Sequence, residues 1–442
     1  MESSINSILD FASVGKCECE VYGERVRRYR VEMHRRKIES IESSRDAGIA
    51  IRLVHEGRVG HVSTSDLSPD GLSAAFQKAL ECASNSTPVD VDILAPYRKE
   101  SIREGLYPKL PSAGGNQVKI AGVRTMEEAC LSHDPRIVNT EGASYTESVG
   151  EVFVASTRGF FRTEERGFCS CSIQAIAKQG DEIRSGWFHA QGLDCGDLDF
   201  ASTGREAAAR AVGLVGSRRI ETRRYPVVLD GSAVTSFLGL LKRALSGEMV
   251  VKGASVLAGR KGSQIAPEYV TVIDDPFLEA GCNNAAFDGE GAPTERRVVV
   301  ESGSLRGYLH NAFSARKLGV PVAANAVRAT FKDLPEPGPT NLFLLPGARS
   351  TAEMVDDLIP GIYVLDVMGM HTADHISGDF SVGISGYHVR SGGDRVPISE
   401  MMMSGNVLDL LAGIREVGKD SIFIGPYGSP AIRIDGMSIS GT

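Results

Sequence analysis

The segment His371–His375 carries the closest pair of histidines in the chain, with Asp374 between them. On a helix, this i, i+4 spacing would place both imidazoles on one face, as in a zinc site. Gly369, Gly378 and the strand-like residues on either side indicate a loop, where the spacing carries little information. Two interpretations follow: metal ligands, or loop histidines that face solvent or form hydrogen bonds.

Two carboxylates, Asp288 and Glu290, alternate with Gly289 and Gly291 just before an expected strand. The carboxylates could bind a cation, and the glycines would let another chain approach closely enough for the segment to hold a peptide backbone. The alternative is a tight surface turn whose carboxylates lie in water. The segment alone does not decide between them.

His310 follows an expected strand and precedes a short helix. An imidazole there could act as an acid or a base, but no partner is identifiable nearby in the sequence, which favours a histidine without catalytic function. The chain has no Walker-type phosphate loop and no G-x-G-x-x-G after a strand, so nucleotide chemistry has no local anchor. It also lacks a G-x-S-x-G elbow, which makes a serine hydrolase unlikely on these motifs.

The composition is that of a folded, water-soluble protein of 442 residues, with 42% hydrophobic and 24% charged residues. The net charge of -8 argues against broad nucleic-acid binding. Eight cysteines without a C-x-x-C pair indicate free thiols. There is no secretory signal and no apolar stretch of the ~20 residues that a membrane helix needs. We therefore expect a cytoplasmic protein with no nucleic-acid or membrane partner.

The first half predicts an N-terminal α+β domain over residues 1–220, built as a loose repeat of a strand meander followed by a helix. In the first copy, two strands flank the turn His55–Arg58, and Ser68 signals the start of a helix that runs to Ser84. The second copy ends in the alanine-rich helix Gly204–Val215. A helix over Asn116–Ser132 separates the copies, and Tyr97–Gly115 is the expected connector.

The second half predicts a strand-rich C-terminal domain over residues 221–442. One expected hairpin pairs Arg297–Glu301 with Leu305–Leu309. The glycine- and cation-bearing stretch Val250–Ala266 predicts an exposed loop. The expected helices are Ser232–Leu245, Ala352–Leu358 and Val407–Val417.

Several strings of the second half, taken in order, resemble the TldD/PmbA family, also called modulators of DNA gyrase. They are Asp274-Asp275-Pro276, the run Phe287–Thr294, Gly307-Tyr308-Leu309 with Ser314–Gly319, Gly378-Asp379-Phe380-Ser381 and Ser404-Gly405-Asn406. Each string is weak alone, but their order is fairly specific, and the first half resembles the family's N-terminal domain less closely.

The resemblance implies a cytoplasmic metallopeptidase of two homologous subunits, only one of which carries the zinc motif H-E-x-x-x-H. In the zinc subunit this motif lies on the helix after the first strand of the C-terminal domain. The matching helix here is Ser232–Leu245, and counting puts Gly239, Leu240 and Ala244 at the motif positions. None of these side chains binds zinc. The family's further cysteine ligand is also missing, because no cysteine follows Cys282.

The chain therefore resembles the PmbA (TldE) type of subunit, with no cofactor of its own and with zinc in a TldD-type partner. Such a subunit would help to hold an extended peptide or unfolded protein by strand addition to an open sheet edge. No catalytic or metal-binding residue is expected, and the implied substrate-binding residues are Asp288, Gly289, Glu290, Gly291 and His371. Two alternatives remain: a homodimeric binding or regulatory protein with the same fold, and a divergent metallopeptidase that uses His371 and His375.

Overall fold

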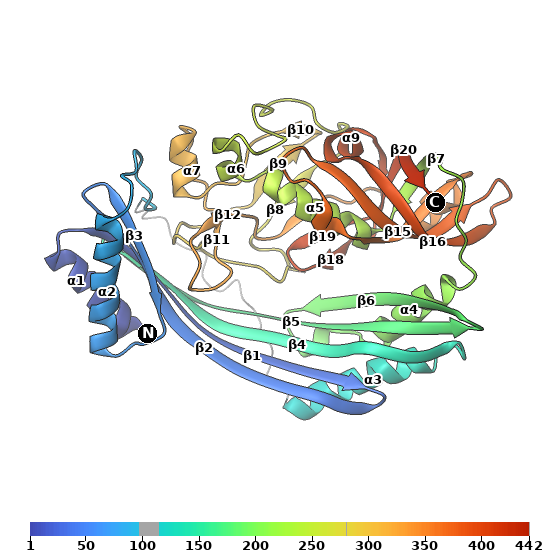
Figure 1. Ribbon diagram of the computed structural model, residues 1–442, viewed down its shortest axis with the longest axis horizontal. Coiled ribbons are helices and arrows are strands. Elements are labelled where there is room, and N and C mark those ends of the chain that lie inside the picture. Colours follow the sequence, from blue (N-terminus) through green and yellow to red (C-terminus); the bar gives the residue numbers. More distant parts are fainter. Residues whose placement is uncertain (97–114, 280, 442) are drawn as a thin grey trace.

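The computed structural model describes residues 1–96, 115–279 and 281–441. Figure 1 shows that the first half of the chain forms one long, curved sheet and that the second half lies along one side of it. The connector predicted over Tyr97–Gly115 falls outside the described residues except for Gly115. Among the described helices, none is both long enough and apolar enough to cross a bilayer.

The first half consists of two copies of one unit: a helix, a three-stranded meander and a second helix. The first copy comprises α1 (Glu2–Val14), β1 (Glu18–His34), β2 (Lys37–His55), β3 (Arg58–Thr64) and α2 (Pro69–Ser84). The second comprises α3 (Asn116–Leu131), β4 (Ile137–Ser156), β5 (Phe160–Gln179), β6 (Glu182–Gly192), the short helix η1 (Cys195–Asp197) and α4 (Phe200–Gly213). The sheet order β3-β2-β1-β4-β5-β6 joins the meanders through the antiparallel pair β1–β4. This confirms the predicted α+β class and the predicted repeat, except that α3, which was predicted to separate the copies, is the first helix of the second copy.

The helix α2 shows how local sequence sets an element boundary. The Ser68 hydroxyl accepts a hydrogen bond from the Gly71 N–H at 3.2 Å. Pro69 begins the helix, where the N–H that it lacks would have no helical partner. The residues that α2 buries, three or four positions apart, are Leu72, Ala75, Phe76, Ala79 and Ala83. This spacing puts them on one face, which packs on β2 and β3.

Residues along β1 and β2 alternate between two environments. Val21 and Ile51 pack beneath the helices α1 and α2, whereas Tyr22 and Ala50 face the second half of the chain. Because successive side chains of a strand point to opposite faces, one sheet serves as the floor for both layers. The sheet therefore has a helix-covered face and a face covered by the second half.

A glycine in the third strand of each meander lets a helix lie directly on the sheet. A Cβ at Gly60 on β3 would stand 1.9 Å from the Ala79 carbonyl oxygen of α2. A Cβ at Gly186 on β6 would stand 2.3 Å from the Ala211 nitrogen of α4. Both copies thus bring a helix backbone to a distance that only glycine permits.

The second half contains two six-stranded sheets and a two-stranded one, β11–β12. One sheet has the order β10-β9-β8-β13-β19-β18. The other has the order β16-β15-β14-β7-β20-β17, and an additional pairing of β16 with β20 closes five of its strands into a ring. The strands are β7 (Arg223–Leu229), β8 (Val272–Asp274), β9 (Arg297–Glu301), β10 (Ser304–Leu305), β11 (Ala326–Val327), β12 (Glu336–Pro337), β13 (Leu342–Leu344), β14 (Gly361–Met368), β15 (Asp379–Val389), β16 (Arg395–Asn406), β17 (Ile414–Val417), β18 (Ile422–Ile424), β19 (Tyr427–Ser429) and β20 (Ile432–Ser440). The helices are α5 (Gly231–Ala244), α6 (Gly247–Val251), α7 (Ala312–Lys317), α8 (Thr351–Asp356), η2 (Met370–Thr372) and α9 (Val407–Ala412).

The predicted helix Val407–Val417 is wrong in its second half. The helix α9 ends at Ala412, and the chain turns at Gly413 into β17, which pairs with β20. Glycine weakens a helix, and the β-branched Ile414 and Val417 fit a sheet better than a helix end. Their pairing with β20 is a tertiary contact that a local pattern does not show.

Two other predicted segments of the second half need correction. The hairpin partner of β9 reaches only from Ser304 to Leu305, and after the Arg306 N–H, which still donates to Val299, the chain leaves the ladder. The predicted exposed loop Val250–Ala266 begins inside α6 and buries Leu257, Ile265 and Ala266 in the core. Gly259, Arg260, Lys261 and Gly262 lie between these apolar anchors.

We expect the substitution Gly60→Ala to lower the free energy of unfolding by on the order of 3 kcal/mol, because the new methyl group meets the backbone of α2. Chemical denaturation followed by circular dichroism measures the change. Gly392→Ala is the control, because nothing lies within 4 Å of a Cβ built at Gly392. Equal stability of the two variants would contradict the close packing of β3 against α2.

Candidate functional site

The segment Asp288–Gly291 is buried between the two halves of the chain. Asp288 is 4% exposed and Glu290 0%. The Glu290 carboxylate accepts hydrogen bonds from the Arg52 guanidinium on β2 at 2.8 Å and from the Ala312 N–H at the start of α7 at 2.7 Å. The interpretation of this segment as a surface turn with solvated carboxylates is therefore wrong.

Four side chains, Glu20, Arg52, Glu290 and Arg328, form what we call the interface ion network. Arg52 and Arg328 each donate to one oxygen of Glu20, both at 2.7 Å. All four side chains are at most 5% exposed. Burial raises the pKa of Glu290, and the charge of Arg52 opposes that rise. Two carboxylates thus face two guanidinium groups, which is the arrangement that buried charge requires.

Asp288 holds the shape of the loop. One carboxylate oxygen accepts the N–H groups of Glu290 and Ala292, both at 2.9 Å, and the other accepts the Ala326 N–H at 3.0 Å. Burial raises the pKa of Asp288 to about 6, and these three donors oppose the rise. The carboxylate is therefore committed to the backbone of its own chain.

The glycines of this loop allow the sheet of the first half to pack closely against it. Gly291 has a φ of +78°, and a Cβ there would stand 2.5 Å from the Phe160 ring of β5. The Arg328 guanidinium donates to the Gly289 carbonyl at 2.9 Å. Substrate binding by Asp288, Gly289, Glu290 and Gly291 stays a prediction, and these contacts would make it a positioning role.

His371 lies in η2, a helix of three residues, and His375 lies in the turn that follows. The loop interpretation is thus confirmed, and no helix face presents the two imidazoles together. Among the described residues, no group of three or more His, Cys, Asp or Glu side chains is placed to hold a metal. Metal binding by His371 and His375 gains no support. His371 is exposed and η2 contacts α5, so its role in substrate binding stays a prediction.

The helix α5 begins at Asp230, whose carboxylate accepts the Ser232 N–H at 3.1 Å. The same side chain accepts hydrogen bonds from Arg210 of α4 at 3.2 Å and from the Tyr363 hydroxyl of β14 at 2.8 Å. Asp230 therefore caps the helix and ties it to both halves of the chain.

The positions of α5 that would carry a zinc motif do not fit the metal. Leu240 and Ala244 are each 3% exposed and belong to the largest apolar core of the second half. Gly239 has no side chain, and a Cβ there would meet the Tyr427 ring at 3.7 Å. Apolar contacts thus occupy the place where zinc ligands would lie.

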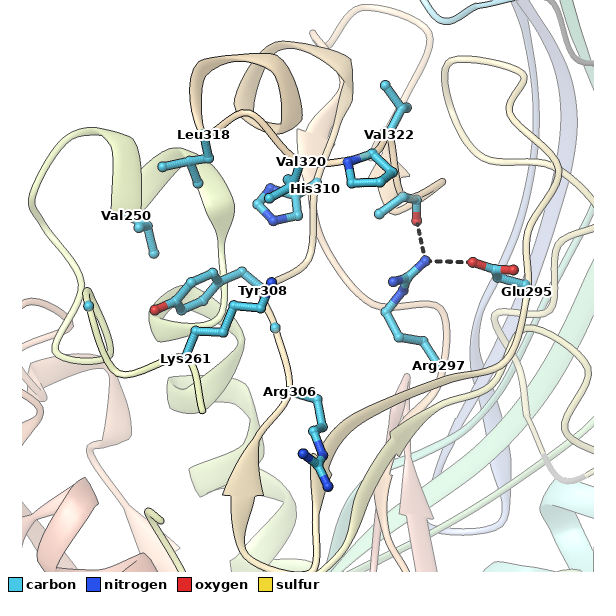
Figure 2. Close-up of a pocket in the computed structure, with 14 residues that line it drawn as sticks. Val250, Lys261, Glu295, Arg297, Arg306, Tyr308, His310, Leu318, Val320 and Val322 are labelled. Atoms are coloured by element: carbon cyan, nitrogen blue, oxygen red, sulfur yellow. Dashed lines mark hydrogen bonds and ion pairs between the residues drawn. The ribbon is translucent and has the colours of Figure 1, made fainter. Parts of the chain in front are cut away.

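A pocket of about 640 Å³ opens beside α6 and α7, and Figure 2 shows the side chains around it. Charged groups on its wall come from segments far apart in the sequence. They are Lys261, Glu295, Arg297 and Arg306. Apolar groups come from α6 and from the segment after α7, and they include Val250, Leu318, Val320 and Val322. The volume falls within the range of small-molecule and peptide side-chain sites.

His310 lies in the wall of this pocket, and the structure supplies the partner that the sequence did not show. Its Nδ1 is 3.2 Å from the Ser314 hydroxyl, one turn later in α7. The Tyr308 ring stands edge-on to the imidazole at a centroid distance of 6.3 Å. Burial, followed by the charges of Arg297 and Lys261, lowers the pKa of His310 to about 4. The imidazole is therefore neutral at pH 7.

Sequence reasoning missed this pocket although parts of it carried a signal. The cations and glycines of Val250–Ala266 marked an irregular segment, and the early end of the hairpin at Arg306 exposes the next residues. The approach of the segment Leu318–Ala323 to these residues depends on the tertiary fold. No short-range pattern in the sequence predicts this approach.

Three family models match successive parts of the chain. They are the PmbA/TldA metallopeptidase domain 1 over residues 19–83, the central domain over residues 115–215 and the C-terminal domain over residues 222–441. The chain belongs to the PmbA/TldD family. The resemblance of its second-half strings to this family is thereby confirmed.

Relatives named PmbA and relatives named TldD both align with most of the chain. Metalloprotease PmbA of Escherichia coli O157:H7 is 28% identical over 429 residues, which cover 95% of this chain and 91% of the relative. A metalloprotease TldD homolog of Buchnera aphidicola subsp. Acyrthosiphon pisum is 25% identical over 426 residues, 90% of this chain and 87% of the relative. These names support a peptidase-related role at the level of the family.

A solved structure matches the fold over its full length. TldE from Thermococcus kodakarensis superposes with a TM-score of 0.88, covers 99% of this chain and 100% of its own, and is 20% identical. At this identity the likeness shows the fold alone. It confirms the mixed α/β architecture described above.

We expect Arg52→Met to lower the free energy of unfolding by about 3 to 5 kcal/mol, because Glu20 and Glu290 would stay buried with a missing partner. The control is Arg25→Met, whose side chain is 56% exposed and whose partner Glu151 is 37% exposed, so its cost stays below about 1 kcal/mol. Urea denaturation of both variants provides the comparison. Similar small losses in both would show that the interface ion network does not hold the halves together.

The histidine pKa gives a second expectation. The unfolded chain takes up a proton at His310 near pH 6.5, whereas the native chain does so only near pH 4. This group's stabilising contribution is therefore complete above pH 6.5 and falls by roughly 3 kcal/mol as the pH drops through 4. In His310→Gln, the free energy of unfolding measured from pH 7 to 4 should fall less steeply than in the unchanged protein.

The control for the pH experiment is His133→Gln, because His133 is an exposed residue far from the pocket in the sequence. Its profile should overlay that of the unchanged protein. If His310→Gln also overlays that profile, His310 titrates alike in the native and unfolded chains, contrary to the expectation.

Proposed function

We propose that the chain is the zinc-lacking subunit of a cytoplasmic, heteromeric metallopeptidase of the PmbA/TldD family. It pairs with a zinc-bearing, homologous TldD-type subunit and helps to bind an extended peptide or unfolded protein for cleavage. The partner supplies the zinc and the catalytic groups. The observation that carries this proposal is α5, which keeps its place in the fold but presents no zinc ligand.

The packing of α5 supports a non-catalytic role. Leu240 and Ala244 fill the core at the motif positions, and the cap at Asp230 holds the helix without a metal. A histidine or glutamate in place of either residue would bury a polar group in an apolar core, which is costly without a partner. The helix is thus built for packing, and the chemistry falls to the partner.

An open sheet edge supports strand addition. The strand β3 pairs with β2 only from Ile49 to His55. In the described part of the chain, residues 37–48 of β2 therefore have β1 on one side and no strand on the other. Ile38 and Ile41 are 43% and 49% exposed there. An unpaired strand edge offers N–H and C=O groups to an extended chain, whether substrate or partner subunit.

The test is metal content and peptidase activity of the chain with and without a TldD-type partner from the same source. We expect well below 0.1 zinc per untagged chain purified without chelators, as measured by plasma mass spectrometry. Alone, the chain should not cleave unfolded peptides. Together with the partner it should raise chelator-sensitive cleavage at least tenfold over the partner alone.

A partner whose motif glutamate is replaced by glutamine is the matched control, and its complex should be inactive. About one zinc per isolated chain, lost in His371→Ala, would instead establish a divergent metallopeptidase that uses His371 and His375. A metal-free homodimer that neither binds a TldD-type partner nor changes its activity would establish the binding or regulatory protein.

A further inference from the structure

The pocket of Figure 2 combines positive charge with an apolar wall. Three cations, Lys261, Arg297 and Arg306, and one carboxylate, Glu295, line the pocket, and Glu295 bonds to Arg297 at 2.8 Å. In the described part of the chain, the Lys261 ammonium has no ion pair or hydrogen bond. The pocket is thus positive although the protein as a whole carries a net charge of -8, so its charge is a local feature with a ligand of opposite sign as its natural complement.

Neighbouring carboxylates neutralise these cations only in part. Arg306 pairs with Glu301 at 2.8 Å, but both side chains are more than half exposed, so this pair is weak. Arg297 donates to Glu295 and to the Ala323 carbonyl, and its buried Nε has no acceptor among the described residues. Lys261 and Arg306 are exposed and therefore retain donors for an anion, whereas Arg297 is held by Glu295 and Ala323 and its remaining Nε is buried.

The opposite wall is suited to an apolar side chain. Val250 comes from α6, and Leu318, Val320 and Val322 come from the end of α7 and the segment after it. In Figure 2 these groups stand on the side of the pocket away from Arg306. Their separation from Arg306 would let one ligand place an apolar group and a charged group at the same time.

Backbone groups along the pocket are free to pair with an extended chain. After β10, the Arg306 N–H still donates to the Val299 carbonyl of β9 at 2.8 Å, but no hydrogen bond of the described residues uses the Gly307 N–H or the Tyr308 N–H. A Cβ at Gly307 would meet nothing within 4 Å. An incoming backbone can therefore approach this segment closely.

We propose that this pocket binds the C-terminal end of an extended peptide whose last residue is apolar. The terminal carboxylate lies against Lys261 and Arg306, the last side chain lies against Val250 and Val320, and the backbone runs along Gly307. The inference deepens the proposed function, on which it rests, by assigning this subunit the recognition of the substrate's chain end.

The test uses the isolated full-length chain and fluorescence anisotropy with an N-terminally labelled Gly-Ser-Gly-Ser-Leu peptide. We expect the free acid to bind at least tenfold more tightly than the same peptide with a C-terminal amide, because the amide removes the charge. A third probe, amidated Gly-Ser-Gly-Asp-Leu, carries its carboxylate on a side chain and should bind like the amide. Binding of this probe as tight as that of the free acid would overturn the chain-end assignment.

Two substitutions locate the binding. Lys261→Gln and Arg306→Gln should each weaken the binding of the free-acid peptide about tenfold and leave the binding of the amidated peptide unchanged. Lys178→Gln, an exposed cation on β5, is the matched control and should bind like the unchanged protein. All three residues are at the surface, so the variants are expected to keep the native melting temperature. Undiminished binding by both pocket variants would overturn the proposal.

A substitution in the apolar wall tests whether this wall recognises the last side chain of the peptide. Val320→Ser should reduce the preference for Leu over Gly as the last residue and keep the preference for the acid over the amide. Loss of neither preference would place the side chain elsewhere and overturn the assignment of this wall. Because no partner or zinc is present, a failure here leaves the subunit role intact, and metal in the isolated chain would overturn that role without changing these affinities.

Discussion

The interface ion network is the constraint on which the arrangement of the two halves depends. A charged side chain loses several kcal/mol of hydration when it is buried, and only opposite charges at hydrogen-bond distance compensate for that loss. Glu20 and Arg52 come from the first sheet, and Glu290 and Arg328 come from the second half. A shift of the halves by a few ångström would leave buried charges without partners, so the network permits one relative position.

The network also positions the pocket. The second oxygen of Glu290 accepts the Ala312 N–H, the first of α7, and α7 ends at the pocket wall near Leu318. On its other side α7 is held by Arg316, which donates to the Asp92 carbonyl at 2.7 Å in the segment after α2. The first half thus holds the end of α7 at Arg316 directly, and it holds the start of α7 indirectly, through the pair of Arg52 with Glu290. Through this helix, it also sets the distance between His310 and the apolar wall.

The sequence could predict those parts of the fold that depend on neighbouring residues. The Ser68 cap, the turn at Glu56-Gly57 and the alternation of β1 each rest on contacts within a few positions, and the repeat of the first half follows from them. The burial of Glu290 could not be predicted, because its partner Arg52 lies 238 positions away. The same alternation of acidic residues and glycines is found in a solvated turn and in a buried loop that packs on a sheet.

The empty zinc position and the retained fold are compatible for a physical reason. A catalytic zinc is bound by a fold that already exists, so the fold need not depend on the metal. In this chain the helix α5 is held by its cap at Asp230, by Arg210 and by the apolar contacts of Leu240 and Ala244. Stability and chemistry are therefore separable here. Under the proposed function, the chain needs no metal of its own, so selection can act on its sheet edge and its pocket walls through the recognition of the substrate chain.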